Sequence, residues 1–290
     1  MSDPTRAPGT AARDADARSE SHSGGPATVG SGLLAGSREL AVPAALGGLL
    51  LLYFVVPVVF FAARVGAVDV YSAFSEPATQ EAIRNSLLTA PVSTAIATVF
   101  GVPLAYVLSR GTFRGKRLVE VAVLLPLVLP PIVGGAVLLT FVGRYTPVGA
   151  LAATAGLPLT DSLVGVILAQ TFVAAPFLVV TARAGFDAVD DRLEEAARTM
   201  GYGPLETFWH VSLPLARTAV AAGVVLTFVR AIGEFGATMM VAYNPRTMPT
   251  RLWVSFVAHG VDAIVPIALA LLAVTVVVVG FVGLLVRRRP

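Results

Sequence analysis

EEAARTMGYGPLETFWHVSLPLA, residues 194–216, is a polar stretch between two strongly apolar runs of a 290-residue chain. It contains three carboxylates, two adjacent alanines, a Gly-x-Gly, a Trp and a Leu-Pro pair. A segment of such definite composition, inserted between runs that suit only an apolar environment, indicates a specific task outside that environment. The composition of the whole chain identifies what the environment is.

Hydrophobic residues make up 56% of the chain and charged residues 13%, and the mean hydropathy is +0.79. A soluble domain carries about 25% charged residues, so a water-soluble fold of this size would lack the charge to cover its surface. The sequence therefore predicts a membrane protein. The chain has no cysteine, which excludes disulfides and thiolate metal sites.

A helix needs roughly 20 apolar residues to cross a bilayer core of about 30 Å. Six runs are long enough, at residues 42–63, 85–109, 121–142, 162–182, 218–242 and 264–286. Because no lipid-exposed backbone group can stay unpaired, we expect an all-α polytopic membrane protein with six transmembrane helices within residues 41–290. Residues 1–40 are rich in Ser, Gly, Ala, Arg and Asp, which predicts a disordered tail.

The distribution of Lys and Arg predicts the orientation. Fifteen of these side chains lie in the termini or in the loops after the second and fourth runs, whereas five lie in the loops on the opposite side. Positively charged loops face the cytoplasm, so both termini and residues 186–216 are predicted to be cytoplasmic. All but one of the 21 basic residues are arginine, a bias that favours a prokaryotic cell membrane. The arginines form no single stripe, which argues against a nucleic-acid partner.

The loop at residues 186–216 is predicted to begin with a short helix at 190–199. Leu193, Ala196 and Ala197 would form its apolar face, and charged residues surround them. This arrangement is typical of an amphipathic helix that lies across the face of the membrane.

A tight turn and a second short helix are predicted to follow. Gly201 and Gly203 permit the turn, and residues 204–211 begin with a proline, which is favoured at the start of a helix. Leu213 and Pro214 would then restart the chain into the fifth apolar run. Small residues at the tip of this loop would let the surface of a partner come close.

Seven positions of this loop have a spacing that resembles a known motif. They are Glu195, Ala196, Ala197, Gly201, Val211, Leu213 and Pro214. Their order is that of the EAA-x3-G-x9-I-x-LP loop of ABC importer permeases, with Val211 in place of the isoleucine. In that family the loop forms a coupling helix that binds a groove of a separate ATPase subunit. The resemblance implies that residues 186–216, here called the coupling segment, bind such an ATPase.

Three further stretches resemble the molybdate, tungstate and sulfate branch of this family. They are LPLVLPPIVGG at residues 125–135, FVGRYTPVGAL at 141–151 and RAIGEFGATMMVAYN at 230–244. The resemblance implies a type I ABC importer permease fold, a homodimer of this chain, two ATPase subunits that carry ATP and Mg²⁺, and an extracytoplasmic substrate-binding protein. It also implies a transport subunit for a tetrahedral oxyanion, most simply molybdate or tungstate, with no enzymatic activity and no cofactor on this chain.

The third apolar run contains the first candidates for a translocation path. Its central stretch, LLPLVLPPIVGG at residues 124–135, holds three prolines and two glycines. Pro130 and Pro131 must break or kink a helix there, and broken backbone at membrane depth either packs within protein or lines a cavity. We therefore expect the third helix to lie beside the path.

The fifth run carries candidates for a gate. Arg230 and Glu234 are four residues apart, so they are predicted to pair on one face of a helix. The pair is either purely structural or part of an outer gate. Gly236 and Thr238 favour the gate, because small residues permit close packing across a dimer axis.

The outer loop at residues 244–261 contains Arg246, Arg251 and Trp253. These residues are predicted to contact the substrate-binding protein, and the alternative is a plain solvated loop. The three histidines of the chain are too far apart in sequence to form a metal site.

Two other functions remain open from the residues alone, and a third is excluded. A sulfate or thiosulfate permease would share the same motifs, and an ion-gradient-driven secondary transporter could use Arg230 and Glu234 as a proton relay. An ATPase within this chain is excluded, because RGTFRGKR at residues 110–117 lacks the first glycine and the hydroxyl of a nucleotide-binding loop.

Overall fold

The computed structural model describes residues 41–64 and 70–287, and every regular element within these ranges is a helix. The predicted tail at residues 1–40 lies outside the described residues. The chain divides into two units at Pro57. Helix α2 (Ala41–Ala63) crosses this boundary and is described by itself, and its 23 residues are long and apolar enough to cross a membrane.

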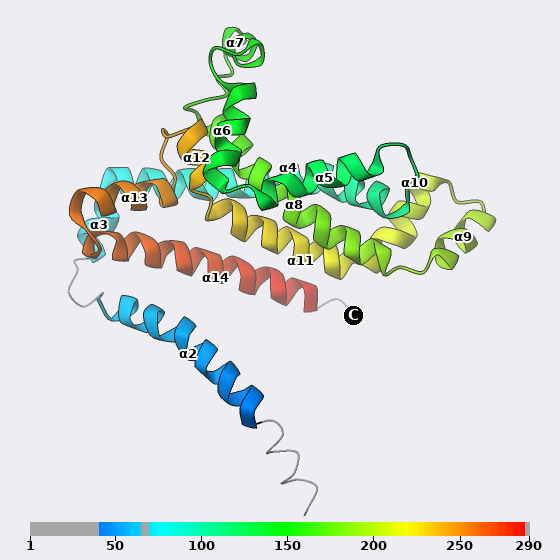
Figure 1. The fold of residues 1–290 in the computed structure, drawn as a ribbon, viewed down its shortest axis with the longest axis horizontal. Helices are drawn as coiled ribbons and strands as arrows, with labels where there is room; N and C mark the ends of the chain where they lie inside the picture. The colour runs from blue at the N-terminus through cyan, green and yellow to red at the C-terminus, as the bar shows by residue number, and fades with distance from the viewer. Residues whose placement is uncertain (1–40, 65–69, 288–290) are drawn as a thin grey trace, which may run out of the picture. The chain divides into compact units, whose positions relative to one another are not determined.

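The second unit contains the remaining helices. They are α3 (Val70–Ser75), α4 (Pro77–Arg110), α5 (Lys116–Val128), α6 (Pro131–Val142), α7 (Pro147–Thr154), α8 (Leu163–Asp187), α9 (Asp191–Thr199), α10 (Pro204–Thr207), the π-helix η2 (Phe208–Ser212), α11 (Leu213–Ile232), α12 (Gly236–Val241), α13 (Met248–His259), the 3-10 turn η3 (Asp262–Ile264) and α14 (Val265–Arg287). Figure 1 shows α8, α11 and α14 running side by side, with α6 and α7 projecting away from them.

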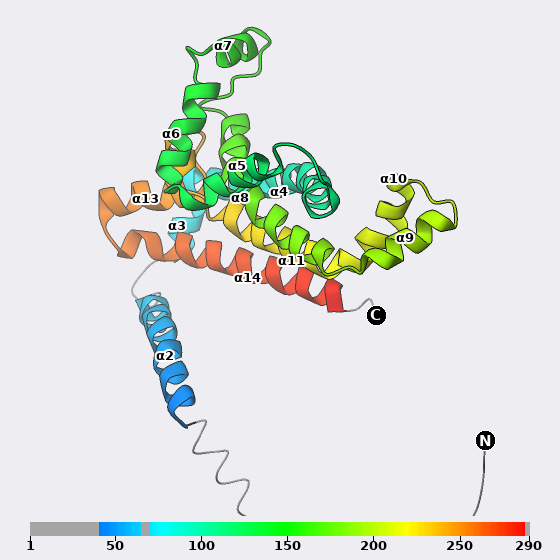
Figure 2. The same ribbon diagram turned by 45° about the vertical axis from the view of Figure 1, so that its right-hand side comes forward.

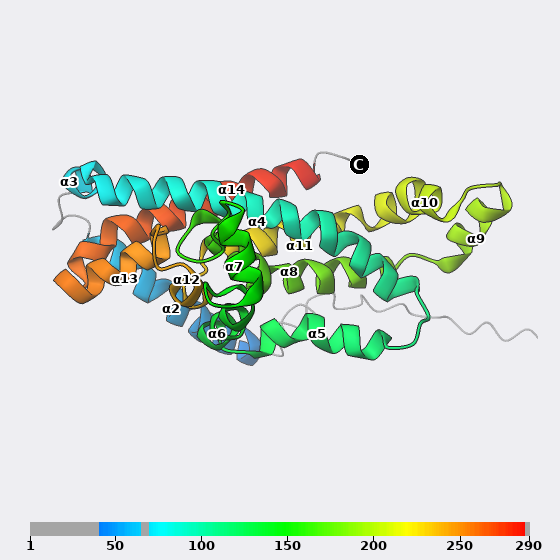
Figure 3. The ribbon, with the colours of Figure 1, turned by 90° about the horizontal axis from the view of Figure 1, so that it is seen from above.

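The core of this unit forms where α8 packs against both α4 and α11 (Figure 3). Small residues make this close packing possible. The buried face of α4 includes Ala82, Ser86, Ala90, Ser93, Ala97, Gly101 and Ala105. On α11, a Cβ at Gly223 would lie 2.9 Å from Cδ1 of the fully buried Leu178. Small side chains let membrane helices approach closely and gain dispersion energy, which replaces the hydrophobic effect within lipid.

The third apolar run is divided into α5 and α6, as the prolines predict. Leu129 and Pro130 between the two helices have ψ angles of 136° and 134°, which are extended values. Each residue precedes a proline, and the proline ring disfavours the helical conformation of the residue before it. Pro131 then occupies the first turn of α6, where its missing amide costs nothing.

The described helices give fewer candidate spans than the six predicted, with differences in the third, fifth and sixth runs. Four stretches are long and apolar enough to cross a membrane, namely α2, α4, α8 and residues 204–232, and α6 with α7, bent by 65°, would make a fifth. The prediction of one helix over 218–242 is wrong, because α11 ends at Ile232 and α12 begins at Gly236. The predicted sixth run corresponds to α14.

Candidate functional site

The coupling segment leaves the end of α8 and forms α9 and α10 at one end of the bundle (Figure 2). Asp190 caps α9, because its side chain accepts a hydrogen bond from the amide of Arg192 at 3.0 Å. Gly201 then adopts a φ of +96°, in the left-handed region that favours glycine. The amide of Gly203 donates to Oε2 of Glu206 at 2.7 Å and fixes the start of α10. The predicted tight turn is therefore present.

Helix α11 begins at Leu213 with Pro214 in its first turn, as predicted, but no break in the chain precedes it. The helix begun by α10 continues through the π turn η2 into α11 without a break. In this turn the amide of Leu213 donates to the carbonyl of Phe208, five residues earlier. The wider turn lets the helix continue through Pro214, which has no amide to donate. Val211 and Leu213 are half-buried, and Pro214 is exposed.

The tip of the coupling segment has an exposed surface of mixed character. Three of the motif residues, Glu195, Ala196 and Gly201, are exposed. Beside them lie the exposed apolar side chains of Met200, Leu205 and Trp209. Exposed large apolar side chains near charged groups, on a segment that is otherwise polar, mark a surface for contact with another protein.

The inward face of α9 differs from the prediction. Of the three residues predicted to form its apolar face, Leu193 is 49% exposed, Ala196 is exposed as well, and Ala197 is buried. The residues of α9 that are buried are Glu194 and Ala197. They are three residues apart and therefore lie on one face of the helix. The inward face is thus built around a carboxylate, and Ala197 packs within the chain rather than against a partner.

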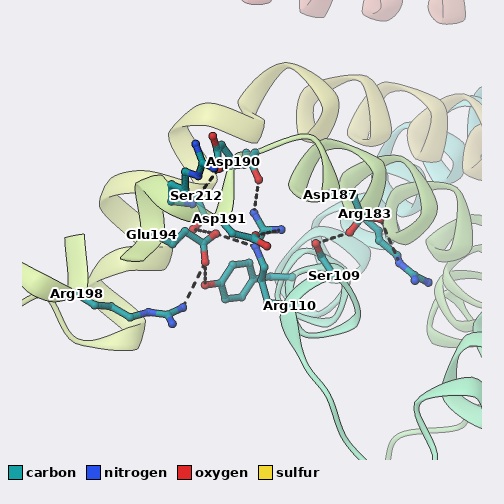
Figure 4. Close-up of polar contacts among 12 residues, drawn as sticks. Ser109, Arg110, Arg183, Asp187, Asp190, Asp191, Glu194, Arg198 and Ser212 are labelled. Atoms are coloured by element: carbon teal, nitrogen blue, oxygen red, sulfur yellow. Dashed lines mark hydrogen bonds and ion pairs between the residues drawn. The ribbon is translucent and has the colours of Figure 1, made fainter. Parts of the chain in front are cut away.

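Glu194 joins the coupling segment to the bundle (Figure 4). Its Oε1 accepts hydrogen bonds from Nε of Arg110 at 3.0 Å and from the hydroxyl of Ser212 at 2.7 Å. Its Oε2 accepts from the Tyr106 hydroxyl at 3.3 Å and from Arg198 at 3.5 Å. The donors come from α4, α9 and η2, so one buried carboxylate holds three elements together.

Arg110 connects this cluster to the connection between α8 and α9. Its guanidinium group also binds Oδ1 of Asp191 at 2.9 Å and donates to the carbonyl of Val189 at 2.8 Å. The Arg110 side chain is 17% exposed and that of Glu194 is 3% exposed. Removal of one member of a buried ion pair leaves an uncompensated charge, at a cost of about 3–5 kcal/mol. The end of α4 is therefore firmly attached to the start of α9.

An aromatic cluster packs next to these polar groups. The rings of Tyr106, Phe186 and Phe208 have centroids 5.3, 4.9 and 6.1 Å apart, in tilted or edge-on arrangements. Such rings exclude water, and hydrogen bonds in a region of low dielectric constant are stronger than in water. The cluster thus strengthens the contacts of Glu194.

The role of Glu194 was missed in the sequence analysis. The motif contains its neighbour Glu195 and not Glu194. The partners of Glu194, Arg110 and Ser212, also lie outside the seven motif positions. The nearest signal was the pair of adjacent glutamates, since two neighbours on a short helix cannot share the same face. One of the two therefore had to point toward the bundle.

Some of the residues predicted for the path lie close to each other. They meet where the break between α5 and α6 contacts α12. A Cβ at Gly236 would lie 2.9 Å from the amide nitrogen of Ile132 and 3.0 Å from Cβ of Pro131, so the approach requires glycine. Thr238 is fully buried, and Pro130 is exposed at the break. The structure therefore brings Pro131 and Gly236 together, and their part in a path stays a prediction.

Arg230 and Glu234 form an ion pair, with 2.5 Å between Nη1 and Oε2. They do not share a helix face as predicted, because α11 ends at Ile232 and Glu234 lies in the break before α12. Glu234 is 1% exposed, and its Oε1 accepts a hydrogen bond from the amide of Ala237 at 2.7 Å. A carboxylate at a helix N-terminus is favourable. Glu234 therefore both pairs with Arg230 and caps α12.

The three predicted contacts for a binding protein lie in or before α13. Arg246 lies over the ring of Tyr243, 5.4 Å from its centroid. Arg251 forms an ion pair with Glu76, and its hydrogen bond lowers the pKa of the Glu76 carboxyl below the ordinary value of 4.5. Trp253 is 44% exposed. Arg251 is thus engaged within the chain, and a contact of the exposed Trp253 with a binding protein stays a prediction.

Comparisons with known proteins agree with this arrangement. Residues 97–289 match the family of binding-protein-dependent transport system inner membrane components. A probable molybdenum ABC transporter permease protein of Haloferax volcanii is 48% identical over 231 residues, which cover 80% of this chain and 84% of the relative. A molybdate/tungstate transport system permease protein of Pyrococcus abyssi is 39% identical over 236 residues, which cover 80% of this chain and 89% of the relative.

A solved structure shows the same fold. It is that of a bacterial alginate ABC transporter in complex with an alginate pentasaccharide-bound periplasmic protein, with a TM-score of 0.66, 18% identity, and coverage of 88% of this chain and 94% of that chain. The family resemblance inferred from the motifs is therefore confirmed. The chain belongs to the inner membrane components of binding-protein-dependent transport systems, as a multi-pass permease subunit of an ABC importer.

Proposed function

We propose that this chain imports molybdate or tungstate as one half of a permease homodimer. Each coupling segment binds one ATPase subunit, which carries ATP and Mg²⁺, and an extracytoplasmic binding protein delivers the oxyanion to the opposite face. Both termini and the coupling segment face the cytoplasm. The names of the two relatives, one for molybdenum and one for molybdate or tungstate, support the substrate class.

The construction of the coupling segment is the observation that carries this proposal. Its tip exposes Glu195, Ala196 and Gly201, whereas its inner face is fastened to α4 and η2 through Glu194. An ATPase that moved the tip would therefore also move the ends of two long helices. Because α11 continues from η2 as far as Ile232, this movement would reach the break next to α12.

The charges near that break suit an anionic cargo. An unpaired carboxylate lining the path would repel an oxyanion through the electric field it creates. Glu234 is buried, and its charge is compensated by Arg230 and by the N-terminus of α12. This compensation supports an oxyanion as the substrate, and it supports a place for the pair in or beside an outer gate.

Reconstitution tests the proposed substrate and energy source. The chain, its ATPase and its binding protein are placed in liposomes, and ATP hydrolysis and uptake are measured with molybdate, tungstate and sulfate at equal concentrations. We expect molybdate and tungstate to stimulate both activities and sulfate to stimulate neither. Preferential stimulation by sulfate would make the chain a sulfate permease, and uptake that depends on a proton gradient without ATP would overturn the proposal.

Orientation and stoichiometry have separate tests. Because the chain has no cysteine, a single cysteine at Ala196 gives an unambiguous labelling site. A membrane-impermeant maleimide should label it only after the cells are opened, and labelling of intact cells would reverse the proposed orientation. The mass of the purified complex should correspond to two copies of this chain, and a second, different permease chain would contradict the homodimer.

A further inference from the structure

A polar cavity lies at the start of α5, at the same end of the bundle as the coupling segment. Its volume is about 540 Å³, and its lining includes Lys116, Arg117, Glu120 and Arg183. A short connection leads back from this cavity to Arg110, which ends α4 and binds Glu194 of α9 as described above. The cavity is therefore at the membrane face that carries the coupling segment.

The charges of this cavity favour an anion. Glu120 is neutralised by Arg183, with 2.9 Å between the carboxylate and the guanidinium group. Lys116 donates only to the carbonyl of Gly111, at 3.1 Å. In the part of the chain that the structure describes, Arg117 pairs with no carboxylate. Arg183 also pairs with Asp187 at 3.6 Å, so Lys116 and Arg117 are the cations of the cavity that have no carboxylate partner among the described residues.

The backbone adds to this preference. The N-cap of α5 is Gly115, which has no side chain to bind the amides of the first turn, although the amides of Lys116 and Leu118 donate to the carbonyls of Phe113 and Gly115. Such amides carry partial positive charge and attract anions. The side chains and the backbone amides at the N-terminus of α5 thus both favour a negatively charged ligand.

A second cavity, which is apolar, lies further along the same two helices, α5 and α8. Its volume is about 340 Å³, and it is lined by α4, α5 and α8, including Leu104, Val123, Pro126, Pro176 and Val179. Val123 lies one turn beyond Glu120 on α5, and Val179 lies one turn from Arg183 on α8. From Glu120 to Pro126 the helix rises about 9 Å toward the middle of the membrane. A charged cavity at the membrane face therefore has an apolar groove about one helical turn further along α5 and α8.

The other side of α5 faces an apolar environment. Leu118 is 74% exposed and Val121 is 60% exposed, and no residue of α5 is buried. In a membrane protein such a helix lies against lipid. The ligand of the two cavities must accordingly be amphiphilic, with a negatively charged group at the membrane face and an apolar chain directed inward.

We propose that this pair of cavities binds an anionic phospholipid. The phosphate group interacts with Lys116, Arg117 and the start of α5, and one acyl chain occupies the groove between α4, α5 and α8. Binding of this lipid stabilises α5, which is one half of the broken third helix, against α8. That the bound lipid belongs to the cytoplasmic leaflet rests on the orientation given under the proposed function. That the cavities bind an anionic lipid does not depend on this orientation.

Native mass spectrometry of the full chain in detergent tests this inference. Phosphatidylglycerol and phosphatidylcholine with identical acyl chains are added separately, and the bound fraction is measured. We expect phosphatidylglycerol to bind at least tenfold more tightly. In the Lys116→Gln/Arg117→Gln variant, the affinity for phosphatidylglycerol should fall about fivefold for each cation removed. The control variant Arg144→Gln removes a cation beyond the C-terminal end of α6, away from α5, and should bind the lipid as tightly as the unchanged chain does.

Two further measurements separate a lipid from other ligands. Ala122→Trp, which places a bulky ring in the apolar groove, should weaken phosphatidylglycerol binding without removing any charge. Inorganic phosphate at a hundredfold excess should not displace the lipid, because it has no acyl chain. Equal binding of the two lipids, no effect of the double variant, or displacement by phosphate alone would overturn the inference. The experiment contains no ATPase and no substrate, so its outcome is independent of the proposed transport function.

Discussion

Glu194 and Glu234 are both fully buried carboxylates in a membrane protein, but they are held in different ways. Glu194 has four side-chain donors, three of them from outside its own helix, and Arg110 and Tyr106 are 84 and 88 residues away in sequence. Glu234 is held by Arg230 and by the amide of Ala237, four and three residues away. The first carboxylate fixes tertiary structure, and the second fixes a local bend. Removal of the two should therefore have different consequences.

The largest effect is expected at Glu194. Glu194→Ala removes the buried partner of Arg110, which is only 17% exposed but keeps its contact with Asp191, so the free energy of unfolding should fall by about 3 kcal/mol, the low end of the range for a broken buried pair. It should also abolish substrate-stimulated ATP hydrolysis, because α9 is no longer fastened to α4. Thermal unfolding of the purified chain and hydrolysis by the reconstituted complex measure the two effects.

Glu195→Ala is the matched control for Glu194→Ala. It removes the same side chain one position later on the same helix, where the carboxylate is exposed. Its effect on the free energy of unfolding should stay within about 0.5 kcal/mol, while ATPase binding should weaken because Glu195 lies on the proposed contact surface. Equal loss of stability in the two variants would contradict the assigned role of Glu194.

A smaller effect is expected at Glu234. Glu234→Gln removes the charge that compensates Arg230, whose side chain is 25% exposed, and should reduce the free energy of unfolding by about 1–3 kcal/mol. The double variant Arg230→Gln/Glu234→Gln leaves no uncompensated charge and should be more stable than the single variant. A double-mutant cycle based on thermal unfolding gives the interaction energy.

The double variant also distinguishes the two roles proposed for this pair. If the pair belongs to an outer gate, the assembled variant should hydrolyse ATP without substrate. If hydrolysis stays dependent on substrate, the pair only stabilises the bend. The gate would then have to involve the contact of Pro131 with Gly236 instead.

The third effect concerns backbone conformation at the tip of the coupling segment. Gly201→Ala forces a Cβ onto a residue with φ of +96°, at a cost of about 1–2 kcal/mol, although the surroundings leave open space. Gly203→Ala is the control, because its φ of −70° suits any residue. We expect only Gly201→Ala to lower substrate-stimulated ATP hydrolysis while leaving membrane insertion unchanged. Equal hydrolysis in both variants would show that the turn tolerates distortion.

The smallest effect is expected at the opposite end of the bundle, where Glu76 is 48% exposed. Arg251 lowers the pKa of this carboxyl below 4.5 in the folded chain, so the pair stabilises the fold above that pH. The contribution should disappear as the pH falls below 4.5 and through the folded pKa. The difference in Tm between the unchanged chain and Glu76→Gln should therefore be small at pH 7 and vanish in acid, and a difference that grows in acid would contradict this account.

The features that follow from local signals were predictable from the sequence. The turn at Gly201 and the break at Pro130 and Pro131 each depend on the conformational limits of one residue type, and the helical class follows from the apolar runs. The spacing of the EAA-like motif identified the family. These signals act over a few residues and need no knowledge of tertiary contacts.

The features that depend on distant partners were not predictable. No local pattern connects Glu194 with Arg110 or Tyr106. The sequence therefore predicts for α9 an apolar face of Leu193, Ala196 and Ala197 and carries no sign that Glu194 is buried. The break after Ile232 was missed because an apolar run continues across it, and hydropathy does not detect a carboxylate that caps the next helix. Glu194 is buried through contacts with distant residues, whereas Glu234 is buried with its local partners Arg230 and Ala237, and the hydropathy of the chain detects neither.

The division of the third apolar run into α5 and α6 has a consequence for the biogenesis of the protein. The two helices have 13 and 12 residues, which correspond to about 20 Å and 18 Å. Neither can span a hydrocarbon core of about 30 Å during insertion. This segment should therefore enter the bilayer stably only when α8, against which both halves pack, has been synthesised. Chains truncated after Val142 should accordingly remain accessible to protease where chains extended through Asp187 are protected.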